Sequence, residues 1–204
     1  SNTPLEHKNR YEYKDNTTID IGPLFAGQSR TFVLTLDDSV DRSKMKVRCS
    51  YFDIAKDKRV RVKEAKFESF DKDDEMLLVE KFRLNMISLL REITKMSDKV
   101  RKLDPAKSAK SAALVRRFAE DLEKAIEKCN NRKAEKRLDA MLIDIEGEIL
   151  LSLTPEHYVR WGRHYLLSML DAHRLELCNN FKDKSVASYV VSFFSSSNKS
   201  ISTS

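Results

Sequence analysis

Residues 71–97 read DKDDEMLLVEKFRLNMISLLREITKMS, and this stretch decides the fold class of the second half of the chain. Acidic residues at its start suit the positive end of a helix dipole. Large apolar residues then recur at steps of three and four, which is the spacing that places side chains on one face of a helix. They are Val79, Phe82, Met86, Leu89, Ile93 and Met96. The stretch predicts a long amphipathic helix that ends near Ser97.

The same spacing recurs three times after this helix. A second helix is expected from about Ser111, after a basic linker that contains Pro105. Asn130–Asn131 interrupts the pattern, and a third helix follows. Thr154–Pro155 opens a fourth, because Thr is a good N-cap and Pro is tolerated at the first helical position. The expected buried residues of these helices are Val115, Phe118, Leu122, Ile126, Cys129, Ala134, Leu138, Met141, Ile145, Ile149, Tyr158, Trp161, Tyr165, Met169 and Ala172.

Before residue 71 the apolar period is two, which indicates strands with one buried face. Residues 29–36 and 44–52 alternate in this way. A turn at residues 55–58 and a second alternating run at 59–63 complete a hairpin. The next apolar pair is offset by one position, and a bulge near Glu64 would absorb the slip. The residues expected on the buried face of the hairpin are Met45, Val47, Cys49 and Tyr51.

Together these patterns predict an α+β fold, in which an N-terminal antiparallel β-sandwich-like unit is followed by a bundle of about four α-helices. The expected divisions are a disordered or extended lead-in at 1–16, a β-sheet unit at 17–70, the helical bundle at 71–186 and a Ser-rich tail at 187–204.

The composition suits a chain rich in charged helices. It has 38 Lys and Arg and 32 Asp and Glu among 204 residues, a net charge of +6 with both signs interleaved. Three widely spaced cysteines give no disulfide framework or zinc spacing and fit a reducing compartment. We expect a cytoplasmic location and no transmembrane segment. Ser1–Asn2 resembles a scar of tag cleavage, so the natural chain is expected to extend further.

The residues that could carry chemistry are poorly spaced for it. His157, His164 and Asp171 recur at steps of seven, about 10.5 Å along a helix, which is too far for one metal ion. Cys178 follows His173 by five residues, which places the two on different helix faces. We therefore expect no metal, no cofactor, no catalytic residue and no enzymatic activity.

The stretch at residues 99–117 is the most basic part of the helical half, and residues 131–137 add a second basic run. Neither contains the interleaved aromatics or the motifs of nucleic-acid binders. We expect a solvated connection between helices and no nucleic-acid partner. Nucleic-acid or membrane-surface binding through residues 99–117 is kept as an alternative.

Two segments resemble a known family. IDIGPLFAGQSRTFV at 19–33 and VRCSYFD at 47–53 resemble the β-region that follows a von Willebrand A domain in plant RING-type ubiquitin ligases and in microbial proteins that join von Willebrand A and Hint domains. YVRWGRHYL at 158–166, with DAH at 171–173 and CNNFKD at 178–183, looks like the C-terminal signature of the Vwaint domain. Lys184–Ser185 departs from it, because the signature has Pro-Gly there.

The resemblance implies half of a β-sandwich plus helices, downstream of a von Willebrand A domain, with no assigned catalytic residues. We expect a non-catalytic structural and protein-interaction module whose partners include an adjacent von Willebrand A domain. The alternative is the substrate-recruiting region of a ubiquitin ligase whose RING or U-box lies outside this chain. The oligomeric state is not indicated. The candidate interaction residues are Trp161, Gly162, His164, Tyr165, His173, Asn179, Asn180 and Phe181.

Three of these expectations are specific enough to test. Trp161 should dock the fourth helix onto the first, with Phe82 or Met86 as neighbours. Gly162 should allow another backbone to approach closely. Residues 179–183 should form an ordered elbow, with the Asn pair in left-handed or turn geometry and the Phe181 ring tucked onto the bundle.

Overall fold

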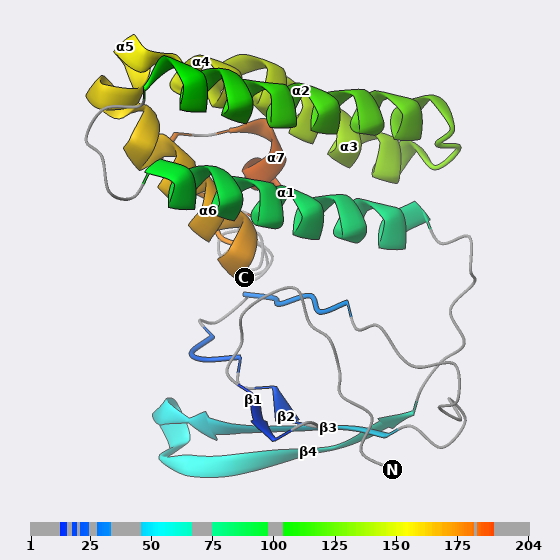
Figure 1. Cartoon of the computed structure of the whole chain (residues 1–204). Helices are drawn as coiled ribbons and strands as arrows, with labels where there is room; N and C mark the ends of the chain where they lie inside the picture. The colour runs from blue at the N-terminus through cyan, green and yellow to red at the C-terminus, as the bar shows by residue number, and fades with distance from the viewer. Residues whose placement is uncertain are drawn as a thin grey trace, which may run out of the picture.

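The computed structural model describes residues 13–15, 18–19, 21–24, 28–33, 46–66, 75–97, 104–181 and 183–189. In this part of the chain helices dominate, and the strands form two separate antiparallel pairs (Figure 1). Strand β1 (Tyr13–Asp15) pairs with β2 (Thr18–Ile19), and β3 (Lys46–Asp53) pairs with β4 (Lys58–Lys66). The predicted β-sandwich-like unit is wrong, because the described strands make only two-stranded sheets.

Residues 29–33, the described part of the strand predicted at 29–36, have no regular secondary structure. Their backbone groups are used elsewhere: the N–H of Thr31 donates to the carboxylate of Glu176, and the C=O of Thr31 accepts from Arg83. A strand would need these groups for its neighbours. The remainder of that predicted strand, residues 34–36, lies outside the described residues.

The β3–β4 hairpin has the expected turn and the expected bulge. A 3₁₀ turn, η2 (Ile54–Lys56), joins the strands, and Asp57 after it takes the left-handed conformation at φ 46°. Val47 pairs with Ala65 but Cys49 pairs with Val62, so β4 holds one residue more than β3 across this step. The bulge predicted near Glu64 is therefore confirmed.

The predicted burial of one hairpin face is wrong at the two positions whose side chains the structure describes. Cys49 and Tyr51, both on the face expected to be buried, are exposed, whereas Met45 and the side chain of Val47 lie outside the described residues. Alternation shows that a strand has an apolar face but does not supply the layer that would cover it.

The helical part consists of two long single helices, two composite runs and one short helix. Their bounds are α1 (Glu75–Ser97), α2 (Pro105–Glu127), α3 (Arg132–Asp144), η3 (Ile145–Ile149), α4 (Leu150–Ser152), α5 (Pro155–His157), η4 (Tyr158–Gly162), α6 (Arg163–Leu175) and α7 (Lys184–Ala187). The turns η3 and η4 are π-helical; η3 contains a kink at Gly147 (φ −85°, ψ −105°), and η4 leads directly into α6. The short α7 makes the number of helical runs nearer five than the four predicted.

Polar caps set the ends of these helices. Thr154 caps α5, as predicted, and Asn131, in the predicted break, caps α3. The start of α2 differs from the prediction by six residues: the Asp104 carboxylate accepts from the N–H of Lys107 at 2.9 Å, and Pro105 is the first helical residue. The supposed linker after Asp104 is thus the first turns of α2.

The core lies between α1, α2, α3 and α6, and Figure 1 shows α1 running beside α6 beneath the α2–α3 pair. The expected apolar stripes supply most of it. Fully buried members include Val79, Met86, Ile93, Val115, Leu122, Leu138, Met141, Ile145, Ile149, Tyr158, Tyr165 and Met169. Phe82, Phe118 and Trp161 pack against this core while only partly buried.

Candidate functional site

Arg83 on α1 is the centre of a buried polar cluster, although it lies among apolar neighbours in the sequence. Its side chain is fully buried. The guanidinium donates to Glu80 Oε2 at 2.6 Å, to the C=O of His173 at 2.8 Å and to the C=O of Thr31 at 3.0 Å. We call this group, with Glu176 and Arg137, the arginine junction. It joins the N-terminal segment at residues 28–33 to α1 and α6.

Carboxylates balance the charge of the arginine junction. Glu80 also pairs with Arg137 at 3.1 Å, and Glu176 lies 3.6 Å from Arg83. Burial by itself would lower the pKa of Arg83, but the charges of Glu80 and Glu176 outweigh it and leave that pKa raised. Arg83 therefore stays charged inside the bundle.

Glu176 reaches the arginine junction from an unusual backbone conformation. It ends α6 in the left-handed conformation, at φ 47°, a position that favours glycine. From there its carboxylate accepts from the N–H and the hydroxyl of Thr31. The Asn pair at 179–180 was predicted to take left-handed or turn geometry; the left-handed residue is Glu176, and Asn179 takes the turn geometry.

A second buried cluster holds α7, and we call it the α7 seat. The carboxylate of Asp144, at the end of α3, accepts from the backbone N–H of Lys184 at 3.0 Å and of Ser185 at 2.8 Å. It also accepts from the Ser185 hydroxyl. A carboxylate at a helix N-terminus satisfies N–H groups that have no partner within the helix. Asp144 thus caps a helix that begins 40 residues later.

His173 completes the α7 seat from α6. Its Nε2 lies 3.1 Å from Ser185 Oγ, and its Nδ1 lies 3.1 Å from the hydroxyl of Tyr189. Because Ser185 donates its proton to Asp144, His173 donates from Nε2 and accepts at Nδ1. Burial, followed by the charges of Arg83 and Arg137, lowers the pKa of His173 to about 3, so the ring is neutral at pH 7.

Asp144 is the titratable acid of the same seat. Burial raises its pKa, and the neighbouring charge of Asp183 acts in the same direction. The hydrogen bonds from Ser185 and Lys184 oppose that shift without cancelling it. Hydrogen bonds from Ser185 and Lys184 thus hold the Asp144 carboxylate at a buried position where water solvates its charge poorly.

The order of these groups argues against nucleophilic catalysis. In a Ser–His–acid triad the imidazole lies between the hydroxyl and the carboxylate, so that it can take the proton of the nucleophile. Here Ser185 lies between Asp144 and His173, and all three are buried. The hydrogen bonds fix α7 instead of activating a hydroxyl.

The described residues of the elbow predicted at 179–183, which exclude Lys182, are held by Asp183. Tyr165 donates its hydroxyl to Asp183 Oδ1 at 2.9 Å, and Asn179 donates to Oδ2 at 2.8 Å. The Asn179 side chain also accepts from the N–H of Phe181 at 3.2 Å, which is an Asx turn. Burial, and then the charge of Asp183, raises the pKa of Tyr165 well above its usual range.

Four aromatic rings form a row along this end of the bundle. His157, Trp161, Tyr165 and Phe181 meet edge to face, with successive ring centroids 5.8, 5.6 and 5.3 Å apart. We call them the aromatic row. Tyr165 is buried, whereas Phe181 keeps about half of its surface exposed. The Phe181 ring therefore contacts the bundle, as predicted, but does not tuck fully into it.

Trp161 has a different setting from the predicted one. Its rings meet His157 and Tyr165, which lie on its own helical run, and it packs against the core while only partly buried. Phe82, proposed as its neighbour on α1, instead meets Phe118 of α2 at a centroid distance of 5.8 Å.

Gly162 allows the close backbone approach that the sequence predicts. A Cβ at this position would lie 2.2 Å from the backbone oxygen of Ser152. Glycine is thus required where the α4 and η4 turns cross.

The structure brings together five of the eight candidate residues and separates the others. Trp161, Tyr165, Asn179 and Phe181 belong to the aromatic row and the elbow, and Gly162 lies beside them. His173 belongs to the α7 seat, while His164 and Asn180 are exposed. Cys178 is exposed and His173 is buried, so the two do not form a pair.

Sequence reasoning missed the polar residues that organise both clusters. They are Glu80, Arg83, Asp144, Glu176, Asp183 and Ser185. One signal was available, because Arg83 falls between Phe82 and Met86 on the apolar side of α1. A charge in that position indicates a buried partner.

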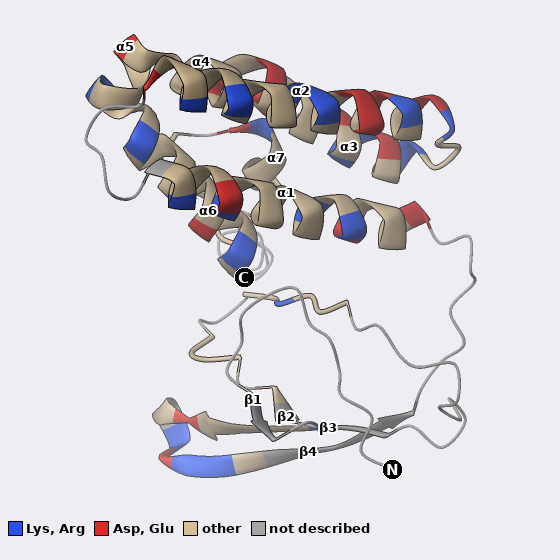
Figure 2. Ribbon diagram, in the orientation of Figure 1, with Lys and Arg blue, Asp and Glu red and all other residues tan. Residues whose placement is uncertain are grey.

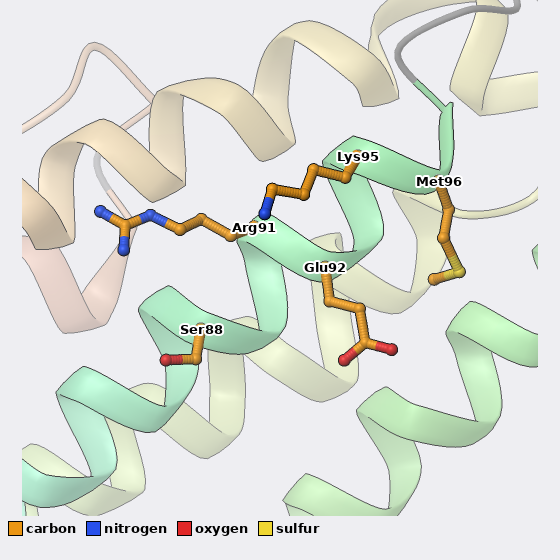
Figure 3. A pocket seen from close by; sticks show the side chains of 5 residues that line it. All are labelled: Ser88, Arg91, Glu92, Lys95 and Met96. Atoms are coloured by element: carbon orange, nitrogen blue, oxygen red, sulfur yellow. The ribbon is translucent and has the colours of Figure 1, made fainter. Parts of the chain in front are cut away.

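Other site classes were sought in the described residues. No group of three or more His, Cys, Asp and Glu side chains there could hold a metal ion, and none of the helices there is long and apolar enough to cross a bilayer. One hollow lies along α1, lined by Ser88, Arg91, Glu92, Lys95 and Met96. In Figure 3 Arg91 and Glu92 extend to different sides of the helix, so the lining does not converge on a ligand.

This end of the molecule is a helical module organised around buried polar contacts, and part of it is similar to a known family. Residues 135–203 match the Vwaint family model, described as VWA / Hh protein intein-like. The resemblance to a Vwaint-type domain is therefore confirmed for this part of the chain, which contains the aromatic row, the elbow and the α7 seat. The match does not reach the segments at 19–33 and 47–53. No curated protein and no solved structure matches the chain.

Proposed function

We propose that the chain is a non-catalytic module that packs against a von Willebrand A domain, with the aromatic row as its contact face. The Vwaint match supports the association with von Willebrand A domains. The observation that carries the non-catalytic part is the α7 seat, where the groups capable of acid, base or nucleophilic chemistry serve as hydrogen-bond partners for a helix.

The aromatic row is the favoured contact face because of its composition and partial exposure. Aromatic side chains are enriched in protein interfaces and contribute most of the energy of those interfaces. Phe181 is about half exposed and rests on the buried Tyr165. A partner that covers Phe181 would therefore bind against a base that is already rigid.

Calorimetric titration with a von Willebrand A domain taken from a protein that also carries a Vwaint domain tests this proposal. We expect binding, and we expect Phe181→Ala to weaken it by about 2 kcal/mol, the size of an interface hot spot. Val159→Ala is the matched control, because Val159 is about equally exposed and lies two residues from Trp161 on a different side of η4. Equal losses in the two variants, or no binding, would contradict the proposal.

The alternatives have less support. No observation in the described residues favours a ubiquitin ligase. For the basic region at 99–117, residues 98–103 lie outside the described part. The charged side chains of α2 within this region are the basic Lys107, Lys110, Arg116 and Arg117, and acidic side chains follow from Glu120 onward (Figure 2). The region contains none of the interleaved aromatics of nucleic-acid binders.

A further inference from the structure

The closed end of the β3–β4 hairpin exposes three large apolar side chains. Ile54 in the turn is 86% exposed, Phe52 56% and Tyr51 49%. We call residues 51–59 the hairpin tip. Large apolar residues that gather at one exposed place, rather than singly, indicate a surface that contacts something else. In Figure 1 this end of the hairpin, in cyan, reaches the edge of the molecule.

The hairpin also carries most of the net charge of the chain. Residues 46–66 contain eight Lys and Arg against three Asp and Glu, which is +5 of the total +6. Close to the apex Lys56, Lys58 and Arg59 are exposed. In the strand register Arg59 lies opposite Phe52 and Lys58 opposite Asp53. Figure 2 shows the basic residues at the start of β4, beside the turn.

The hairpin tip brings apolar and basic groups together, and this combination indicates the kind of anionic partner. Ile54 lies in the turn, Lys58 lies opposite Asp53, and Arg59 lies opposite Phe52. At about 3.3 Å per strand residue, Lys58 and Arg59 lie within a Debye length, about 8 Å, of a surface that the apex touches. The surface of an anionic lipid bilayer offers both contacts, an interface that accepts apolar and aromatic side chains and charged headgroups.

A nucleic acid fits this arrangement less well. Single strands bind by stacking bases on aromatic faces along a groove, and an aliphatic apex contributes nothing to stacking. Ile54 is the most exposed large apolar residue among those described here.

We propose that the hairpin tip docks the chain peripherally onto an anionic membrane surface. Ile54 and Phe52 enter the lipid interface, while Lys58 and Arg59 contact the headgroups. The proposal does not depend on the von Willebrand A association, because the tip and the aromatic row are separate surfaces.

Co-sedimentation of the full chain with lipid vesicles tests it. We expect binding to phosphatidylcholine vesicles that contain phosphatidylserine, weak binding to phosphatidylcholine alone, and loss of binding at high salt. Ile54→Ser should weaken the binding roughly tenfold, the effect of removing one large buried apolar side chain. Lys58→Glu with Arg59→Glu should weaken it by at least as much.

Ile143→Ser is the control for Ile54→Ser, because it makes the same change at an exposed isoleucine on α3, outside the hairpin. It should leave the binding unchanged. Circular dichroism should show that all variants keep their helical content, since each change is at an exposed position. The proposal is overturned if anionic vesicles are not bound, or if Ile54→Ser has no more effect than Ile143→Ser. It is also overturned if single-stranded RNA binds as tightly as the vesicles and Ile54→Ser leaves both unaffected.

Discussion

The hairpin and the α7 seat differ in burial, and the difference is the reverse of what the polarity of their side chains predicts. The hairpin has an alternating apolar pattern, yet Cys49, Tyr51 and Phe52 are exposed. The α7 seat consists of polar side chains, yet Asp144, His173 and Ser185 are buried. Burial is therefore decided by what the neighbouring elements supply. A polar group is buried when hydrogen-bond partners meet it, and an apolar face stays exposed when no layer covers it.

The largest test of this contrast is at Arg83. Arg83→Ala leaves Glu80, Glu176 and the Thr31 carbonyl without their buried partner, and we expect the free energy of unfolding to fall by about 3–5 kcal/mol. Urea denaturation measures the change. Lys81→Ala, at an exposed site on α1, is the control. If Arg83→Ala lowers the free energy of unfolding by less than about 1 kcal/mol, the arginine junction contributes no more than a surface ion pair does.

The next test is the pH dependence that His173 confers. Its folded pKa is about 3 against an unfolded value of 6.5, so between these values the unfolded chain binds more protons and stability falls as the pH falls. Each pH unit in this window costs about 1.4 kcal/mol, or about 2 kcal/mol between pH 6.5 and pH 5.

Denaturation curves across this range, compared with those of His173→Gln, isolate the contribution of the ring. The raised pKa of Asp144 acts with the opposite sign at the acid end, because the folded chain keeps a proton there that the unfolded chain releases. It is present in both proteins and largely cancels in the difference. If the two proteins lose stability in parallel from pH 6.5 to pH 5, His173 is not held neutral by the bundle.

Gly162 tests how tightly the helical turns of the bundle pack against each other. A methyl group there meets the backbone of Ser152, which cannot move as a side chain could, so Gly162→Ala should cost about 1–3 kcal/mol. Thermal denaturation provides the measurement. Gly147→Ala is the companion variant, because a Cβ at Gly147 meets no atom within 4 Å, and its loss should be the smaller one.

The smallest effect is expected on the hairpin. Because Cys49 is exposed, Cys49→Ser should change the free energy of unfolding by less than about 0.5 kcal/mol. The same change at a buried cysteine would leave an unsatisfied hydroxyl and cost more. A loss above about 1 kcal/mol would indicate that Cys49 is buried, as the alternating pattern predicts.

Local features of the fold could be predicted from the sequence, whereas contacts between distant segments could not. The caps at Asn131 and Thr154 follow from residue type, and the bulge near Glu64 follows from an offset in a period of two. The bond from Ser185 to Asp144 spans 41 positions and involves residues that look like ordinary surface polar groups. The same holds for Thr31, whose strand-like surroundings gave no sign that bundle side chains take its backbone groups.

The candidate site divides in the same way. Tyr165, Asn179 and Phe181 could be proposed because they belong to a recognisable signature, and Gly162 because of its chemistry. Their common partner, Asp183, lies at the end of that signature but became visible as a ligand for Tyr165 and Asn179 only in three dimensions.

The π-helical turn η4 gives this region a tolerance in length. A turn closed by i→i+5 hydrogen bonds holds about one residue more than an α-helical turn. Deleting a single residue between Tyr158 and Gly162 would therefore let the turn close as α-helix and leave the phase of α6 relative to α5 nearly unchanged. Tyr165 would still face Asp183, and His173 would still face Ser185. Within α6 the chain has no spare residue, so a deletion between Tyr165 and His173 would rotate one relative to the other by about 100°.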